Sequence, residues 1–208
     1  MELLDLIAQG EHQQQDFKYK ISSIAKIAHS VSAFANTDGG RLLVGVRDNG
    51  RIAGIASEEE IYMIEGAANT YCKPKVECHM ETVEENGHTV LVATVPKSDS
   101  RPVMAKCEDG MWRAYVRVAD ENIVASAIHL ELWRQETSVL GELQPFNDLE
   151  QHYMQIIADA GENGILLNRF CRLSHLQRHR AIQLMARWIR FDLLQMLLQD
   201  HKWVIKFK

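Results

Sequence analysis

The sequence predicts an α+β fold in which helices pack on a mixed or antiparallel sheet, followed by a small helical module. Apolar residues recur with the 3.6-residue period of a helix over residues 21–36. Several later segments alternate apolar and polar residues and are separated by short turn sequences, as in β-hairpins. The chain has 208 residues, of which 46% are hydrophobic. Both values suit a folded chain of one or two domains and exclude a disordered one.

The first long helix is predicted over residues 21–36, where apolar side chains share one face. These side chains are Ile21, Ile24, Ala25, Ala28, Val31 and Ala35. Such a stripe is buried when the helix packs on a sheet. Gly39 and Gly40 follow the helix, and glycine suits a chain that leaves a helix with a positive φ angle.

Three hairpins and one further helix are predicted after this point. Leu42, Val44 and Val46 alternate as a strand, and the turn 48–50 would return the chain as an antiparallel strand over 52–55. The remaining predicted segments are a helix over 57–71, a hairpin of 76–83 with 90–95, and a hairpin of 104–107 with 112–118. The predicted core contains Ile24, Ala28, Val31, Val44, Val46 and Val92.

A domain boundary is predicted after a helix over 124–136, because Gly141 and Pro145 interrupt the pattern. The expected division is a first domain over 1–137, a linker over 138–146 and a C-terminal module over 147–208. Asn147 is a suitable N-cap for a helix that runs to about Ala160.

The two parts differ in charge. Residues 1–146 contain 14 Lys and Arg against 22 Asp and Glu, whereas residues 147–208 contain 9 against 6. No acidic residue occurs from Asn163 to Phe191. The segment instead carries Arg169, Arg172, Arg178, Arg180, Arg187 and Arg190, together with His175 and His179.

Three interpretations of the C-terminal module stay open. Apolar residues over 173–197 predict the buried side of one or two helices, and residues 203–207 predict a final strand. Together these suggest an abbreviated winged helix whose arginines contact nucleic acid. Alternatively, the arginines form a solvated surface. In the third interpretation, which is compatible with nucleic-acid binding, the apolar, Met-rich side of residues 182–198 forms a homodimer.

The first third of the chain carries four linked motifs. They are Gly10-Glu11 before Asp16-Phe17-Lys18, then Ala33-Phe34-Ala35-Asn36-Thr37-Asp38-Gly39-Gly40, then Gly45-Val46-Arg47-Asp48-Asn49-Gly50, then Ile52-Ala53-Gly54. A weaker fifth motif is Tyr115-Val116-Arg117-Val118. In this order they resemble the Schlafen-type AlbA-like (AlbA_2) DNA-binding domain of bacterial proteins, over about residues 1–137.

The resemblance implies candidate site residues. Nuclease members of the Schlafen group carry three carboxylates, which correspond here to Glu11, Asp16 and Asp48. Such a set would bind Mg²⁺ or Mn²⁺, ions that stabilise the oxygens of phosphodiester cleavage. Lys18 lies two residues after Asp16, on the same strand face, and would neutralise a phosphate. Asp16 replaces the glutamate that is usual in the family.

Several other site classes find no support in the sequence. The sequence lacks the G-x-x-x-x-G-K-[ST] loop that would indicate ATP binding. Cys72, Cys78, Cys107 and Cys171 form no C-x-x-C unit and are expected as reduced thiols. A zinc site of Cys72, Cys78, His79 and Cys107 is disfavoured, because residues 78 and 79 would point to opposite faces of a strand. No apolar run approaches the roughly 20 residues that a bilayer requires.

The sequence thus predicts a cytoplasmic nucleic-acid-binding protein that acts as a transcriptional regulator on DNA. Its expected nucleic-acid contacts are Lys18, Arg169, Arg172, Arg178, Arg180 and Arg187. The alternatives are a metal-dependent endonuclease for structured RNA such as tRNA, and a self-associating interaction module without catalysis.

Overall fold

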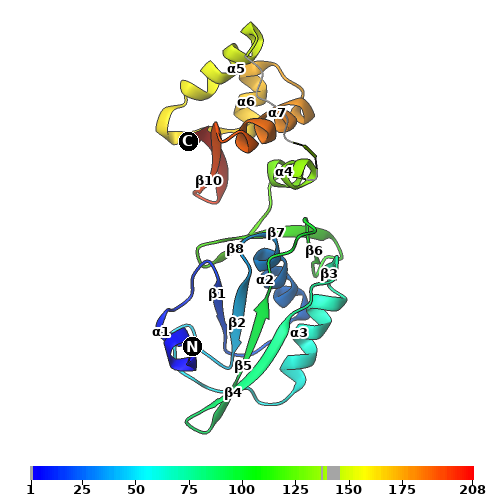
Figure 1. The fold of residues 1–208 in the computed structure, drawn as a ribbon, viewed down its shortest axis with the longest axis vertical. Coiled ribbons are helices and arrows are strands. Elements are labelled where there is room, and N and C mark those ends of the chain that lie inside the picture. Colours follow the sequence, from blue (N-terminus) through cyan, green and yellow to red (C-terminus); the bar gives the residue numbers. More distant parts are fainter. Residues whose placement is uncertain (1, 137, 140–145) are drawn as a thin grey trace. The chain divides into compact units, whose positions relative to one another are not determined.

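The structure is a computed structural model that describes residues 2–136, 138–139 and 146–208. The chain divides into two compact units, Met1–Ala125 and Ser126–Lys208. Figure 1 shows their helices and strands. The predicted boundary lay later in the chain, and residues 140–145 of the predicted linker lie outside the described residues.

The first unit contains a four-stranded mixed sheet of order β1-β2-β5-β4. Its strands are β1 (Gln15–Lys18), β2 (Gly40–Val44), β4 (His79–Glu85) and β5 (His88–Val95). Strand β1 pairs with β2 in parallel, while β2–β5 and β4–β5 are antiparallel. The predicted second hairpin is therefore confirmed as β4 and β5.

A second four-stranded sheet of the first unit has the order β3-β6-β7-β8. Its strands are β3 (Cys72–Lys73), β6 (Met104–Lys106), β7 (Trp112–Val118) and β8 (Glu121–Val124). The antiparallel pairing of β6 with β7 confirms the predicted third hairpin. Sequence patterning missed β3 and β8, because each is a short strand whose pairing comes from a neighbour.

Helix α2 (Ile24–Asn36) packs between these two sheets and confirms the first predicted helix. Ser23 caps it by accepting a hydrogen bond from the Lys26 N–H. Helix α3 (Glu59–Asn69), also predicted, packs on the same core. Helix α1 (Leu3–Ala8) was not predicted; it covers the other face of the first sheet through Leu3 and Leu6.

The predicted hairpin at 42–55 is wrong in extent. Strand β2 ends at Val44, and the expected return strand is reduced to one bridge between Val46 and Ile52. The cause is Gly45, whose φ of 94° breaks the alternation. A Cβ at Gly45 would lie 2.7 Å from the backbone of Gly54, so no other residue fits there.

The predicted core is largely correct but is divided by the first sheet. Ala28, Val31 and Val44 are buried in the cluster around α2. Val46 and Val92 are buried in the smaller cluster beneath α1. Ile24 is only partly buried at the edge of the α2 cluster.

The second unit combines four helices with a three-stranded sheet in the residues that the structure describes. The helices are α4 (Ala127–Glu136), α5 (Asp148–Ala158), α6 (Leu167–Ser174) and α7 (Arg178–Arg190), with a 3₁₀ turn η1 (Gly161–Asn163). The strands are β9 (Ile165–Leu166), β10 (Leu194–Gln199) and β11 (Lys202–Phe207), in the order β10-β11-β9. As predicted, Asn147 caps α5, by accepting from the Glu150 N–H at 2.9 Å.

The structure corrects two expectations for the second unit. Helix α4 was assigned to the first domain, yet Ile128 is buried in the core of the second unit. Residues 194–199 were expected to continue a helix, but they form β10. Asp192 ends the helical path with a φ of 63°, and Asp200 and His201 turn the chain into β11 with φ of 47° and 56°. Positive φ at both central residues is what a two-residue hairpin turn requires.

The apolar side of residues 182–198 packs within the second unit. Met185 and Leu194 are buried there, and Ile182, Ile189 and Met196 pack against them. Homodimerisation through this side stays a prediction. None of the described helices combines the length and the apolarity needed to cross a membrane.

Candidate functional site

Asp16 on β1 is held by a buried arginine from the second sheet. The Asp16 side chain is 5% exposed and the Arg117 side chain 1% exposed. The Arg117 Nη2 atom lies 3.4 Å from Asp16 Oδ1 and donates to the Gln15 carbonyl oxygen at 3.0 Å. The guanidinium also lies 5.1 Å from the centre of the Phe34 ring. A buried carboxylate is tolerated when a cation and hydrogen bonds compensate its charge, as here.

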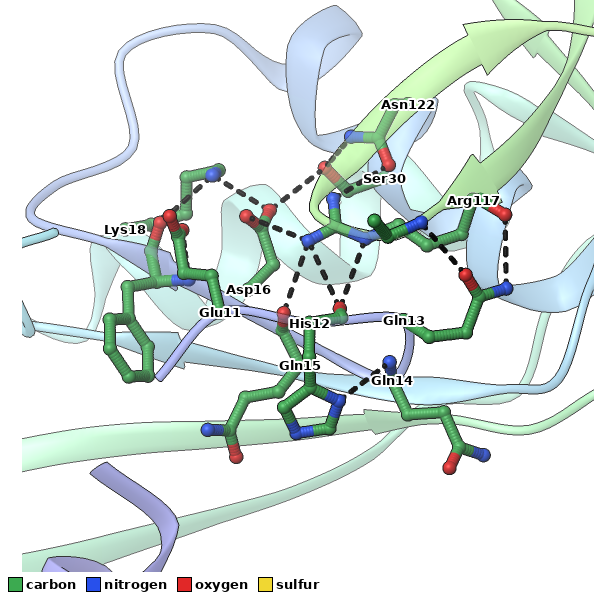
Figure 2. A network of polar contacts seen from close by, with 12 residues as sticks. Glu11, His12, Gln13, Gln14, Gln15, Asp16, Lys18, Ser30, Arg117 and Asn122 are labelled. Carbon is green, nitrogen blue, oxygen red and sulfur yellow. Dashed lines mark hydrogen bonds and ion pairs between the residues drawn. The ribbon is translucent and has the colours of Figure 1, made fainter. Parts of the chain in front are cut away.

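Two further side chains close this contact into a ring (Figure 2). Arg117 Nη1 donates to Asn122 Oδ1 at 3.0 Å, and Asn122 Nδ2 donates to Ser30 Oγ at 2.9 Å. Ser30 Oγ in turn donates to Asp16 Oδ2 at 3.4 Å. The ring joins β1, α2, β7 and β8, so the polar atoms of Asp16 connect both sheets of the first unit.

Lys18 and Glu11 lie on the more open side of Asp16. Lys18 Nζ is 2.7 Å from Asp16 Oδ2, and its side chain is 33% exposed. Glu11 Oε1 accepts a hydrogen bond from the Phe17 N–H at 2.9 Å. The structure therefore gathers three of the predicted site residues, Glu11, Asp16 and Lys18, beside β1.

The surroundings shift the ionisation of Glu11. Burial raises the pKa of its carboxyl above the ordinary value, and the neighbouring Asp16 carboxyl raises it further. The Phe17 N–H and the Lys18 ammonium lower the same pKa, with smaller effect than burial. Two close carboxyls with one raised pKa are a recurrent feature of functional sites, and also of structural clusters.

Asp48 is placed differently from the other two carboxylates. It lies exposed in the turn that follows Val46. Among the described residues, no group of three His, Cys, Asp or Glu side chains lies close enough to hold a metal ion. Asp48 thus does not complete a three-carboxylate group with Glu11 and Asp16, and the fit of Mg²⁺ or Mn²⁺ to these residues is poor. The same finding covers the zinc set of Cys72, Cys78, His79 and Cys107, and the four cysteines are free.

The helix-end motif that follows α2 connects elements of the first unit. Asn36 Nδ2 donates to the carbonyl oxygens of Val103 and Tyr115, both at 2.9 Å, and Asn36 Oδ1 accepts from the Val103 N–H. Thr37 Oγ1 accepts from the Arg117 N–H at 3.0 Å. Both side chains therefore bind the second sheet and are not directed at a ligand.

The glutamines before β1 have a similar role. Gln13 donates to the Arg117 carbonyl oxygen at 3.0 Å and accepts from the Ala119 N–H at 2.9 Å. Gln15 donates to the carbonyl oxygens of Leu6 and Gly10. These bonds fix the loop that carries Glu11 and so set its position beside Asp16.

The arginines of the second unit contrast with Arg117. Arg169, Arg172, Arg178 and Arg180 are exposed on α6 and α7. Arg178 donates to Asn168 Oδ1. Arg187 is partly buried and lies 3.7 Å from Glu150 Oε1. The six predicted nucleic-acid contacts thus divide into four exposed arginines and two paired cations, Lys18 and Arg187.

Sequence reasoning missed Arg117 and Ser30 as partners of Asp16. The only signal was the place of Arg117 in the weak fifth motif, between apolar residues of a predicted strand. An arginine at a buried strand position requires a partner. The amino-acid sequence does not show that this partner is Asp16.

Comparison with known structures finds weak similarities. A Corynebacterium diphtheriae protein is 18% identical with a TM-score of 0.47, over 92% of this chain and 34% of that one. This chain therefore spans about a third of that protein. The N-terminal domain of a RecG-related protein from Nitrosomonas europaea is 23% identical with a TM-score of 0.45, over 71% of this chain and 100% of that one.

A search among curated proteins finds no match. A family model does match. The model for "Schlafen, AlbA_2" covers residues 11–126, which include β1, Arg117 and the motif at the end of α2. The match spans more than half of the sequence, and the chain therefore belongs to the Schlafen AlbA_2 family.

Proposed function

We propose that this chain binds nucleic acid and acts as a DNA-binding transcriptional regulator, with its second unit serving as a winged helix. The AlbA_2 domain supports this proposal at the level of the family. The observation that carries it is the surface of α6 and α7. No ion pair joins Arg169, Arg172, Arg178 or Arg180 to a carboxylate of the described residues.

The order of elements in the second unit supports the winged-helix assignment. Helix α5 is followed by β9, then α6 and α7, then the hairpin of β10 and β11, and β11 pairs with both β10 and β9. Helix α7 buries Ala181, Met185 and Trp188 and exposes Arg180 and Gln183 on another side. In a winged helix the helix before the hairpin enters a groove of DNA, so α7 would present these exposed residues to it.

The direct test is binding of the pure chain to labelled duplex DNA, single-stranded DNA and tRNA, measured by fluorescence anisotropy across a salt series. We expect binding to duplex DNA with a logarithmic affinity that falls linearly with the logarithm of salt concentration. Tighter binding to tRNA than to DNA would move the function to RNA. No binding to any of the three at low salt would refute the proposal.

A second candidate function, metal-dependent cleavage of RNA, is favoured by one observation. Glu11, Asp16 and Lys18 lie together beside β1. Against it, Arg117 and Lys18 already compensate the charge of Asp16, and Asp48 does not join the group. We therefore derive no metal-dependent step, and rank cleavage below binding.

A further inference from the structure

A cavity of about 400 Å³ lies within the second unit, where three helices begin beside the final hairpin. Its lining comes from the starts of α4, α6 and α7 and from β11. The lining residues include Ser126, Asn168, Arg178, Lys202 and Trp203. Its volume is near the lower end of the roughly 300–1,000 Å³ typical of small-ligand sites, so it suits a single small ligand.

The polar lining of this cavity is cationic. Arg178 and Lys202 are its charged residues, and no carboxylate of the described part of the chain lines it. Arg178 is oriented by its hydrogen bond to Asn168, which lines the same cavity. A guanidinium has five N–H donors, so this bond leaves others available for an anion. The starts of three helices add partial positive charge of the same sign.

An aromatic wall adjoins these cations. Trp203 lies in β11 directly after Lys202, lines the cavity and is a partly exposed residue. The His129 ring packs against it in an edge arrangement, with centroids 4.5 Å apart. His129 Nδ1 is in turn 2.9 Å from Ser126 Oγ. These contacts fix the indole, so the ring is a preformed surface for a planar group.

We propose that this cavity binds one nucleotide, with its phosphate on Arg178 and Lys202 and its base against Trp203. Arginine and lysine are the usual partners of phosphate, and aromatic rings are the usual platforms for unstacked bases. The inference goes beyond the proposed function, which concerns duplex DNA; a nucleotide within a nucleic acid offers the same two groups as a free nucleotide. In a nucleic acid the base has to be unpaired, so single strands and frayed ends fit and an intact duplex does not.

The first experiment measures binding of AMP, adenosine and inorganic phosphate to the full chain by isothermal titration calorimetry. We expect AMP to bind more tightly than either part alone. Lys202→Ala should weaken AMP binding about tenfold or more, the effect of losing a charged hydrogen bond. Lys206→Ala is the matched control, because Lys206 lies in the same strand but pairs with Glu162; it should leave AMP affinity unchanged.

A second pair of variants tests the aromatic wall. Trp203→Leu should weaken AMP binding about fivefold or more, the effect of losing one stacked base, and should leave phosphate binding unchanged. Trp203→Phe retains an aromatic ring and should restore most of the affinity. Melting temperatures of all variants separate loss of binding from loss of folding. Equal AMP affinity in Lys202→Ala, Trp203→Leu and the parent chain, or no AMP binding by the folded parent, would overturn the proposal.

The source of the nucleotide is resolved by titrating a short single-stranded oligoadenylate and a duplex of the same length. Loss of oligoadenylate binding in Lys202→Ala and Trp203→Leu identifies a nucleotide within a strand. Loss of AMP binding alone identifies a free nucleotide. If nucleic acid binds normally in both variants and AMP does not bind the parent, this inference fails and the proposed function stands. If AMP binds to the parent chain and no nucleic acid does, this inference stands and the proposed function fails.

Discussion

The surroundings of Asp16 in β1 and the surface of α6 and α7 both contain cationic groups, but the two regions use them in opposite ways. In the first unit Arg117 is buried against Asp16, and Lys18 lies beside the same carboxylate. In the second unit Arg169, Arg172 and Arg180 are exposed. The cations of the first unit compensate the Asp16 carboxylate within the fold, whereas these three arginines of the second unit remain accessible to a polyanion.

This difference shows why a family motif and a binding surface need not coincide. Asn36, Thr37 and Arg117, all from motif segments, form hydrogen bonds that join α2 and β1 to the second sheet. The contribution of these hydrogen bonds to stability is sufficient to explain why the three residues occur in the motifs. The exposed arginines stabilise little, because exposed charges gain little from folding.

The largest expected effect is on the stability of the first unit. Arg117→Ala should lower its free energy of unfolding by about 3–5 kcal/mol, because the buried Asp16 carboxylate would lose its buried cation and keep only the partly exposed Lys18 as a charged partner. Urea unfolding followed by circular dichroism measures this. Arg113→Ala is the control, since Arg113 pairs with Asp109 at the exposed end of the same strand. Equal losses in the two variants would show that the Asp16 contact has no special role.

Next in size is the effect of the α7 arginines on binding. Changing Arg178, Arg180 and Arg187 to Ala together should weaken binding to any duplex sequence. The slope of log affinity against log salt should become shallower by about 0.9 for each lost phosphate contact. The matched control changes Lys73, Lys75 and Lys97 of the first unit to Ala and should leave the slope unchanged. A slope that changes only in the control would place the binding surface on the first unit.

The pH dependence of the second unit should show a smaller effect. Burial lowers the pKa of His129 from 6.5 to about 4. The unfolded chain therefore binds the proton more readily, and stability is complete above pH 6.5 and declines as the pH falls toward 4. Between pH 7 and 4.5 the loss should be about 2 kcal/mol. His129→Gln should remove this part of the dependence, while exposed His175→Gln should retain it; equal profiles in both variants would contradict the assignment.

The smallest expected effect concerns cleavage. Incubation of tRNA with the chain and Mg²⁺ or Mn²⁺ should give weak cleavage or none, because Asp48 lies apart from Glu11 and Asp16. Asp48→Asn and Glu11→Gln should then behave as the parent chain in a gel assay. Strong cleavage by the parent that is lost in Asp48→Asn, with tRNA binding retained, would establish the nuclease function and reverse the ranking proposed above.

Local patterns were sufficient for the elements with a clear period. Helices α2, α3 and α5 and the β4–β5 and β6–β7 hairpins follow from apolar spacing, turn residues and the Asn147 cap. Sequence patterns failed for short or partner-dependent strands. Strand β10 was taken for helix because Leu193, Met196 and Leu197 have helical spacing, and its pairing with β11 decided otherwise.

The sequence by itself determined the α+β class, the family, the main helices and hairpins, and the contrast between an acidic first part and a basic second part. These depend on residue type and on spacing along the chain, which the sequence states directly. Only the tertiary structure decided that Asp16 meets Arg117, 101 residues away, that Asp48 stays apart, and that Arg178, Lys202 and Trp203 line one cavity. Such contacts depend on how distant elements pack, and periodicity along the chain carries no information about that distance.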